Sequence, residues 1–197
     1  MYEPVDKSFF EAPGLELAKQ LVGQYIVHEL PEGRIVARIV ETEAYQGPED
    51  RAAHSFGNRR TKRTEIMFGD AGLVYTYQMH THTLINVVAG PVGTPHAILI
   101  RAVEPVEGHA LMRENRGPKL KEVDWTNGPG KLTVALGITM DYYGHHWSHK
   151  PLFISKGERL GPIEAGPRVG IGNSGEAVHY PWRFYEIDNP FVSKYRK

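Results

Sequence analysis

Two glutamates stand two positions apart at the end of a strongly apolar segment of this chain. Residues 34–40, RIVARIV, have the β-branched composition of a buried strand, and ETEAY follows directly. Because side chains of a strand alternate between its faces, we expect Glu41 and Glu43 to continue the face of Ile35 and Ile39. Burying a carboxylate is costly unless it is paired, so an acid at the end of an apolar face is a candidate functional group.

Three kinds of chemistry would use such an acid. Carboxylates at positions i and i+2 of a strand lie about 6.5 Å apart, close to the spacing in inverting glycoside hydrolases, so a carbohydrate hydrolase is one alternative. A metal-dependent hydrolase is the second, with ligands from His80 and His82 or from His145, His146 and His149, although the sequence has no HExxH motif. The third is removal of a base from a nucleic acid, where one carboxylate activates water.

The distribution of charge is more informative than its sum. The 197 residues include 23 Lys and Arg and 23 Asp and Glu, so the net charge does not indicate a nucleic-acid partner. Residues 51–63, however, hold five basic side chains and no acidic one, and further basic groups occupy 113–121 and 193–197. Such segments are usually solvated surface. Three basic segments in a chain that also has an acidic strand end favour a functional role over a merely solvated surface.

Strands dominate the elements that must position these residues. The patterns predict a helix at 14–23, a hairpin of strands at 24–30 and 34–45, and short helices at 48–55, 105–115 and 130–138. Further strands are predicted at 72–79, 83–90, 96–103 and 151–157. We therefore expect an α+β fold: a single mixed domain over residues 1–197, with a curved, largely antiparallel sheet flanked by helices.

Composition also restricts where the protein works. There is no cysteine, which excludes disulfides and thiolate metal ligands. The first residues, MYEPVDKSFFE, lack the basic start and apolar run of a signal peptide, and no stretch approaches the roughly 18 apolar residues of a membrane span. We expect a soluble, cytoplasmic protein with no membrane partner.

Five motifs then follow one another along the chain: ETEAYQGPEDRAAHS at 41–55, MFGDAGLVYTY at 67–77, LIRAVEP at 99–105, NGPGKLTVALGI at 127–138, and RVGIG followed by PWRFY within 168–185. In this order they closely resemble the alkyladenine (3-methylpurine) DNA glycosylase family of base-excision repair. The resemblance implies the family's own mixed α/β domain rather than the helix-hairpin-helix fold. It also implies a monofunctional enzyme that excises damaged purines such as 3-methyladenine, 7-methylguanine, hypoxanthine and ethenoadenine.

The resemblance assigns the catalytic residues. Glu43 is implied to be the general base that deprotonates the water attacking C1′ of the deoxyribose, with Glu41 as a supporting residue. Arg101 is implied to share this water, and the backbone carbonyl of Val169 to accept a further hydrogen bond from it. One carboxylate can suffice, because an alkylated purine is already a cationic leaving group and the anion stabilises an oxocarbenium-like transition state.

A stacking slot for the flipped base is implied as well. Tyr45 and Tyr77 match the family's aromatic walls, and His54 matches the residue on the other side of the base. Backbone groups of Ala52 and His54 are implied to face the edge of the base. Asn86 matches the asparagine whose amide excludes the exocyclic amine of normal guanine.

Double-stranded DNA containing damaged purines is the implied partner, bound by a monomer without a metal or other cofactor. The hairpin after Tyr77 is one residue shorter than in family members with a wedge tyrosine, so Met79 or His80 is expected to enter the minor groove from this protruding hairpin. No lysine is implied at the site, so we expect no imine with the abasic sugar. Phosphate contacts are implied for Arg59, Arg60, Thr61, Arg63 and Lys131.

Other classes remain as alternatives. A non-catalytic damaged-DNA sensor would keep the aromatic and basic residues while losing the acid. A metal-dependent hydrolase would lose activity in EDTA, and a carbohydrate hydrolase would ignore DNA. If the chain is bacterial, we expect it to associate with the nucleoid.

Overall fold

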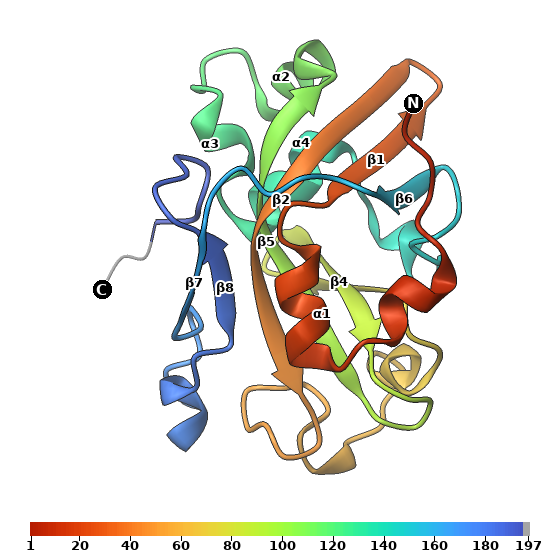
Figure 1. Ribbon diagram of the computed structural model, residues 1–197, viewed down its shortest axis with the longest axis vertical. Helices are drawn as coiled ribbons and strands as arrows, with labels where there is room; N and C mark the ends of the chain where they lie inside the picture. Colours follow the sequence, from red (N-terminus) through yellow and green to blue (C-terminus); the bar gives the residue numbers. More distant parts are fainter. Residues whose placement is uncertain (195–197) are drawn as a thin grey trace.

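An eight-stranded antiparallel sheet runs through the structure, a computed structural model that describes residues 1–194 (Figure 1). Its main path has the order β3-β4-β5-β2-β1-β6, and β8 pairs with both β2 and β7. The predicted mixed fold with a largely antiparallel sheet is confirmed. The strands are β1 (Tyr25–Leu30), β2 (Gly33–Gln46), β3 (Val74–Met79), β4 (His82–Ala89), β5 (His96–Glu107), β6 (Leu152–Ser155), β7 (Ile163–Gly166) and β8 (Arg183–Glu186).

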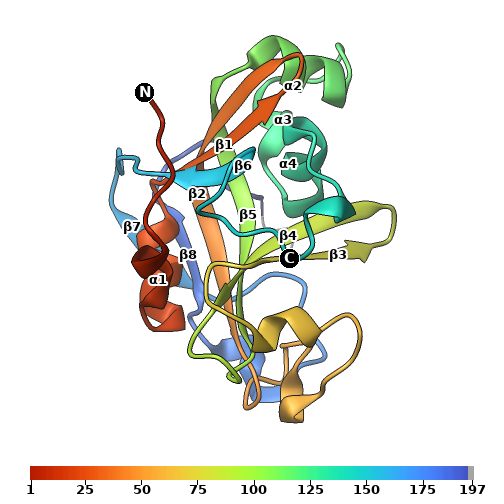
Figure 2. The same cartoon turned by 90° about the vertical axis from the view of Figure 1, so that its right-hand side faces the viewer.

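Helices cover both faces of the sheet, with α1 on one side and α2, α3 and α4 on the other (Figure 2). Their bounds are α1 (Gly14–Leu21), α2 (His109–Arg116), α3 (Val123–Thr126) and α4 (Pro129–Leu136). α4 begins with a proline in its first turn and ends at Gly137, which has a left-handed φ of 68°. None of the helices within residues 1–194 combines the length and the apolar character needed to span a membrane.

The longest strand, β2, organises the site. One edge of β2 pairs with β5, while the other edge pairs first with β1 and then, from Glu41 to Glu43, with β8. Glu43 lies opposite Leu99 of β5 and Arg183 of β8. A residue in the middle of a sheet is fixed by strands on both sides, so the position of its side chain is well determined.

The alternation predicted for β2 holds through its acidic end. Thr42 faces α1, where its hydroxyl donates to the carbonyl of Ala18 at 2.8 Å, and Glu43 points to the opposite face. Ile35 and Ile39 are fully buried in the core at the other end of the strand. β2 therefore ends in acid because this part of the face borders a pocket instead of the apolar side of a helix.

Two predicted helices differ from the structure. Residues 48–55 form turns, because the Asp50 carboxylate accepts the backbone N–H groups of Gln46 and Ala52 and so competes with helical bonding. The helix predicted at 105–115 begins only at His109, after Gly108 with φ 84°, and β5 takes the residues before it. The short elements α3, β7 and β8 were not predicted, since they have four residues each and no clear periodicity.

Candidate active site

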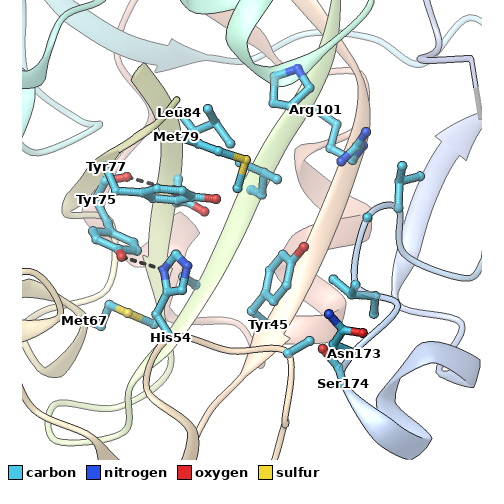
Figure 3. Close-up of a pocket in the computed structure, with 18 of the residues that line it drawn as sticks. Tyr45, His54, Met67, Tyr75, Tyr77, Met79, Leu84, Arg101, Asn173 and Ser174 are labelled. Atoms are coloured by element: carbon cyan, nitrogen blue, oxygen red, sulfur yellow. Dashed lines mark hydrogen bonds between the residues drawn. The ribbon is translucent and has the colours of Figure 1, made fainter. Parts of the chain in front are cut away.

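A cavity of about 450 Å³ opens beside the acidic end of β2, the right size for a small ligand (Figure 3). It is bordered by β3 and β4, by the loop that follows β2, and by residues 169–174 of the loop that follows β7. Eight of the residues that the sequence predicted for the site line it: Tyr45, Ala52, His54, Tyr77, Met79, Asn86, Arg101 and Val169.

Glu43 lies directly behind this lining and has no exposed surface. Its Oε1 accepts the backbone N–H of Val169 at 2.6 Å. Its Oε2 accepts the hydroxyl of Tyr45 at 2.7 Å and Nη1 of Arg101 at 3.4 Å. The structure thus brings together the residues predicted for catalysis, and Val169 contributes a contact that was not predicted, from its N–H group to Glu43.

Glu41 is equally buried but bonded differently. Its Oε1 accepts Nε of Arg101 at 3.2 Å, Nε of Arg183 at 2.6 Å and the hydroxyl of Ser193 at 2.9 Å, and its Oε2 accepts the Ser193 N–H at 2.8 Å. These four donors match the roughly four acceptor sites of a carboxylate. Glu41 therefore supports the site by holding Arg101 and Arg183.

Arg101 links the two carboxylates. Burial by itself lowers the pKa of Arg101, but Glu43 and Glu41 beside it raise the pKa above its usual value. The guanidinium is consequently cationic and supplies positive charge at the edge of the cavity, where it lies beside Tyr45 in Figure 3.

The aromatic walls are uncharged. Burial, and then the charges of Arg63 and Arg59, lower the pKa of His54 to about 4. Burial also raises the pKa of Tyr45 well above its usual value and raises that of Tyr77. A neutral imidazole and two neutral phenols provide flat surfaces on which a heteroaromatic ring can stack.

Tyr75 is a pocket residue that sequence reasoning missed. Its hydroxyl lies 2.8 Å from Nδ1 of His54, the bond drawn between these two residues in Figure 3. The ring of His54 packs edge-on against Tyr77, with ring centroids 4.7 Å apart. The available signal was the alternation of VYTYQ, which places Tyr75 on the same face as Tyr77.

Two predicted polar contacts with the base are already engaged within the protein. The N–H of Ala52 donates to Asp50 Oδ1 at 3.0 Å, so this N–H group is not directed at the cavity. Nδ2 of Asn86 donates to the carbonyl of Tyr75 at 3.0 Å and fixes the amide plane at the cavity wall. A hydrogen bond of this kind is an ordinary structural contact between neighbouring strands. It is also compatible with the steric role predicted for Asn86.

The β3–β4 hairpin projects beyond α4 (Figure 2). Met79 pairs with His82 across a turn of two residues, and His80 in that turn has φ 53°. The side chain of Met79 lines the cavity even though the residue is 46% exposed. The two predicted wedge residues therefore sit at the tip of one hairpin, with Met79 nearer the pocket.

The predicted phosphate-binding residues are arranged unequally. Arg59 is exposed, whereas Nη2 of Arg60 is 2.6 Å from Oε1 of Glu65 in an exposed ion pair. The guanidinium of Arg63 lies over the ring of Tyr77, 5.4 Å from its centroid. Arg59 is therefore better placed than Arg60 to meet an incoming anion.

The other two predicted phosphate contacts belong to ordered local structure. The N–H of Thr61 donates to the Thr64 hydroxyl at 2.9 Å. Nζ of Lys131, in the first turn of α4, donates to Oδ1 of Asn127 at 2.7 Å. The N–H of Thr61 must share or exchange its present partner to bind a phosphate, whereas the ammonium of Lys131 has two further donors.

Two histidines of the 145–149 cluster bond to other parts of the chain. Nε2 of His145 lies 2.7 Å from the carbonyl of Leu152, and Nε2 of His146 lies 3.2 Å from that of Ala71. Among residues 1–194, no three His, Asp or Glu side chains converge in a way that could hold a metal ion.

Comparison with known proteins agrees with this geometry. Residues 8–190 match the model of the family described as methylpurine-DNA glycosylase (MPG). Proteins named "Putative 3-methyladenine DNA glycosylase" include one from Bacillus licheniformis, 58% identical over 98% of both chains, and one from Bacillus subtilis, 56% identical over 97% of both. A third, from Listeria monocytogenes, is 46% identical over 98% of this chain and 94% of its own. With its family model matched almost throughout and its acid, arginine and tyrosines grouped at one pocket, the chain belongs to the methylpurine-DNA glycosylase family.

Proposed function

We propose that this protein is a monofunctional DNA glycosylase that excises alkylated or deaminated purines from duplex DNA and leaves an abasic site. The observation that carries the proposal is the position of Glu43, buried behind an aromatic pocket with three hydrogen-bond donors. A carboxylate offers about four acceptor sites, so one remains for a water molecule. In this proposal the chain forms one domain, which both recognises the damaged base and hydrolyses its N-glycosidic bond.

The pocket would hold the damaged base by stacking. Tyr45 lies on one side of the cavity, and Tyr77 and His54 lie on the other, as Figure 3 shows. Because every purine has an aromatic face, stacking between such walls accepts several lesions. Asn86 would exclude guanine through a clash between its fixed amide and the exocyclic amine.

Hydrolysis would proceed at C1′ of the extruded nucleotide. Glu43 accepts a proton from water while the water oxygen bonds to C1′, and the electrons of the broken N-glycosidic bond pass to the purine. A purine methylated at N3 or N7 is cationic before cleavage and leaves neutral, whereas neutral hypoxanthine or ethenoadenine leaves as an anion that then takes up a proton. The negative charge of Glu43 also stabilises the oxocarbenium-like transition state, and Arg101 pairs with the carboxylate at 3.4 Å.

Extrusion of the nucleotide would depend on the β3–β4 hairpin. We assign the wedge to Met79, since it lines the cavity, while the left-handed turn directs His80 to the hairpin tip. The expected result is that Met79→Ala weakens excision from a paired lesion more than His80→Ala does. Single-turnover excision from duplex and single-stranded substrates separates the two, since only the duplex needs a wedge.

The same lining supports the expectation that the protein has no lyase activity. None of the cavity-lining residues in the described chain is a lysine. We therefore expect borohydride to trap no covalent adduct between the protein and an abasic site. A trapped adduct would contradict the monofunctional mechanism.

The decisive experiment is single-turnover release of hypoxanthine and ethenoadenine from labelled duplex DNA in EDTA, with Glu43→Gln as the variant and duplex binding measured in parallel. Excision by the wild type, together with binding but no excision by the variant, would establish a metal-independent glycosylase. If the wild type bound but did not cut these lesions, 3-methyladenine and 7-methylguanine would be tested next. Binding without cleavage of any of the four would support the damaged-DNA sensor instead.

A further inference from the structure

A buried ion pair close to the site has no part in the function proposed above. Arg168 and Asp50 both have fully buried side chains, and Arg168 lies outside the cavity lining. Taking two charges out of water costs several kcal/mol for each ion, and the attraction offsets this cost only when the geometry is very good. The contacts of the pair indicate which groups it holds in position.

The guanidinium of Arg168 makes a two-pronged bond to Asp50. Nη1 donates to Asp50 Oδ2 at 2.5 Å and Nη2 donates to Oδ1 at 2.8 Å. Nη1 also donates to the carbonyl of Ala44 at 2.8 Å. Since Ala44 lies between Glu43 and Tyr45 on β2, the pair connects the loop after β7 to the strand that carries the catalytic acid.

The same guanidinium lies against the ring of Tyr45. The distance from its carbon to the ring centroid is 4.6 Å, and the ring of Trp182 lies 5.1 Å from the same carbon. A planar cation between two aromatic rings stabilises both rings and restricts their rotation. Tyr45 is therefore held by Arg168 at its ring and by Glu43 at its hydroxyl, at 2.7 Å.

Arg168 also determines the position of the next residue. The N–H of Val169 donates to Oε1 of Glu43 at 2.6 Å. Because one peptide unit separates the two residues, fixing Arg168 on Asp50 fixes this N–H group as well. Both oxygens of Glu43 thus have a partner whose position depends on Arg168.

We propose that Arg168, held by Asp50, is the positioning residue of the active site: it aligns the Glu43 carboxylate and the stacking face of Tyr45 without touching the substrate. This inference rests on the proposed glycosylase function and adds to it a residue that acts through others. A small displacement of a catalytic group can slow chemistry strongly, even when binding is unaffected.

The test compares Arg168→Lys with Arg38→Lys. Lysine keeps the positive charge but lacks the planar fork, so it cannot bond Asp50 in two places or stack flat on Tyr45. Arg38 is the matched control, because it lies on β2 and forms buried ion pairs with Glu104 and Glu186 outside the cavity lining. Each variant is measured for melting temperature, duplex binding, fluorescence of ethenoadenine in the bound duplex, and single-turnover excision.

We expect Arg168→Lys to slow single-turnover excision by about 30-fold, to alter ethenoadenine fluorescence, and to leave duplex affinity unchanged. Arg38→Lys should lower the melting temperature while its excision rate and fluorescence match the wild type. Asp50→Asn, a second variant that keeps the size of the side chain, should repeat the Arg168→Lys result. All assays are made well below the lowest melting temperature, so that unfolded protein does not contribute.

Wild-type excision and fluorescence in both Arg168→Lys and Asp50→Asn would overturn the inference. So would a loss of rate in all three variants in proportion to their melting temperatures. The proposed function fails in a different way: the wild type itself would then excise none of the four lesions, and the inference would fall with it.

Discussion

Glu41 and Glu43 are two positions apart on one strand, share a face, are both fully buried and both bond Arg101, yet their other partners differ. Glu41 receives donors from Arg101, Arg183 and Ser193 that match all its acceptor sites. Glu43 receives one long bond from Arg101, together with the Tyr45 hydroxyl and a backbone N–H. Burial therefore does not distinguish the two acids, whereas the nature and number of their donors do.

Replacing the acid beside the pocket gives the largest expected effect. Glu43→Gln keeps the shape of the side chain but removes the base, so we expect single-turnover excision to fall by about 1000-fold with duplex binding unchanged. Quench-flow or gel-based release of labelled product measures the rate. A fall of less than tenfold would mean that the comparison has assigned the wrong carboxylate.

Replacing Glu41, whose acceptor sites are all occupied, tests the other half of the comparison. Glu41→Gln leaves Arg183 and Arg101 with less negative charge in a buried cluster, so we expect a loss of about 3 kcal/mol in the free energy of unfolding. Urea unfolding measures it. The folded fraction should keep far more activity than Glu43→Gln, and equal losses of activity in the two variants would remove the distinction between them.

The neutral pocket wall predicts that the stability of the protein depends on pH. The pKa of His54 is lowered to about 4 by burial, then Arg63 and Arg59, whereas an unfolded histidine titrates near pH 6.5. Between these values the unfolded chain binds more protons, so stability falls as the pH drops from about 6.5 to 4. We expect His54→Gln to show a smaller fall in unfolding free energy over this range.

His28, His96 and His146 also have a lowered pKa, each chiefly through burial, and they contribute to the decline in both proteins. The informative quantity is therefore the difference between wild type and His54→Gln at each pH. Parallel curves would show that His54 is protonated as readily in the folded protein as in the unfolded chain.

The smallest effects concern the surface around the pocket. If Arg59 contacts one phosphate, Arg59→Ala should reduce the slope of log affinity against log salt by about 0.9. Arg60→Ala should change the slope less, because Arg60 is already paired with Glu65 at 2.6 Å. Fluorescence anisotropy at several salt concentrations measures both slopes, and equal changes would indicate that the Arg60 pair opens on DNA.

Much of the fold could be predicted because strand and helix periodicity is local. The strands that carry Glu43, Tyr77 and Arg101 follow from alternation and β-branched composition, and the resemblance in their motifs identified the residues. Residues 48–55 could not be predicted in the same way. Their turns depend on Asp50 and on Arg168, 118 positions further along, and no local pattern encodes a partner at that distance.

The donors to Glu43 show the same limit. A motif indicates that Val169 belongs to the site, but only the folded loop shows that its N–H group donates to the acid. Tyr75 was missed because a tyrosine in a strand is usually core, and its role depends on contact with His54 from another loop.

The bond between Glu41 and Ser193 has a consequence for how the protein is made. It joins the second strand of the chain to a residue 152 positions later, and the same serine hydroxyl lies within 3.3 Å of Nη2 of Arg101. A growing polypeptide on the ribosome acquires these contacts only after synthesis has passed Ser193, long after the pocket tyrosines have emerged. Products that stop before Ser193 would therefore lack these contacts to Glu41 and Arg101 and would carry an incomplete arginine cluster at the pocket.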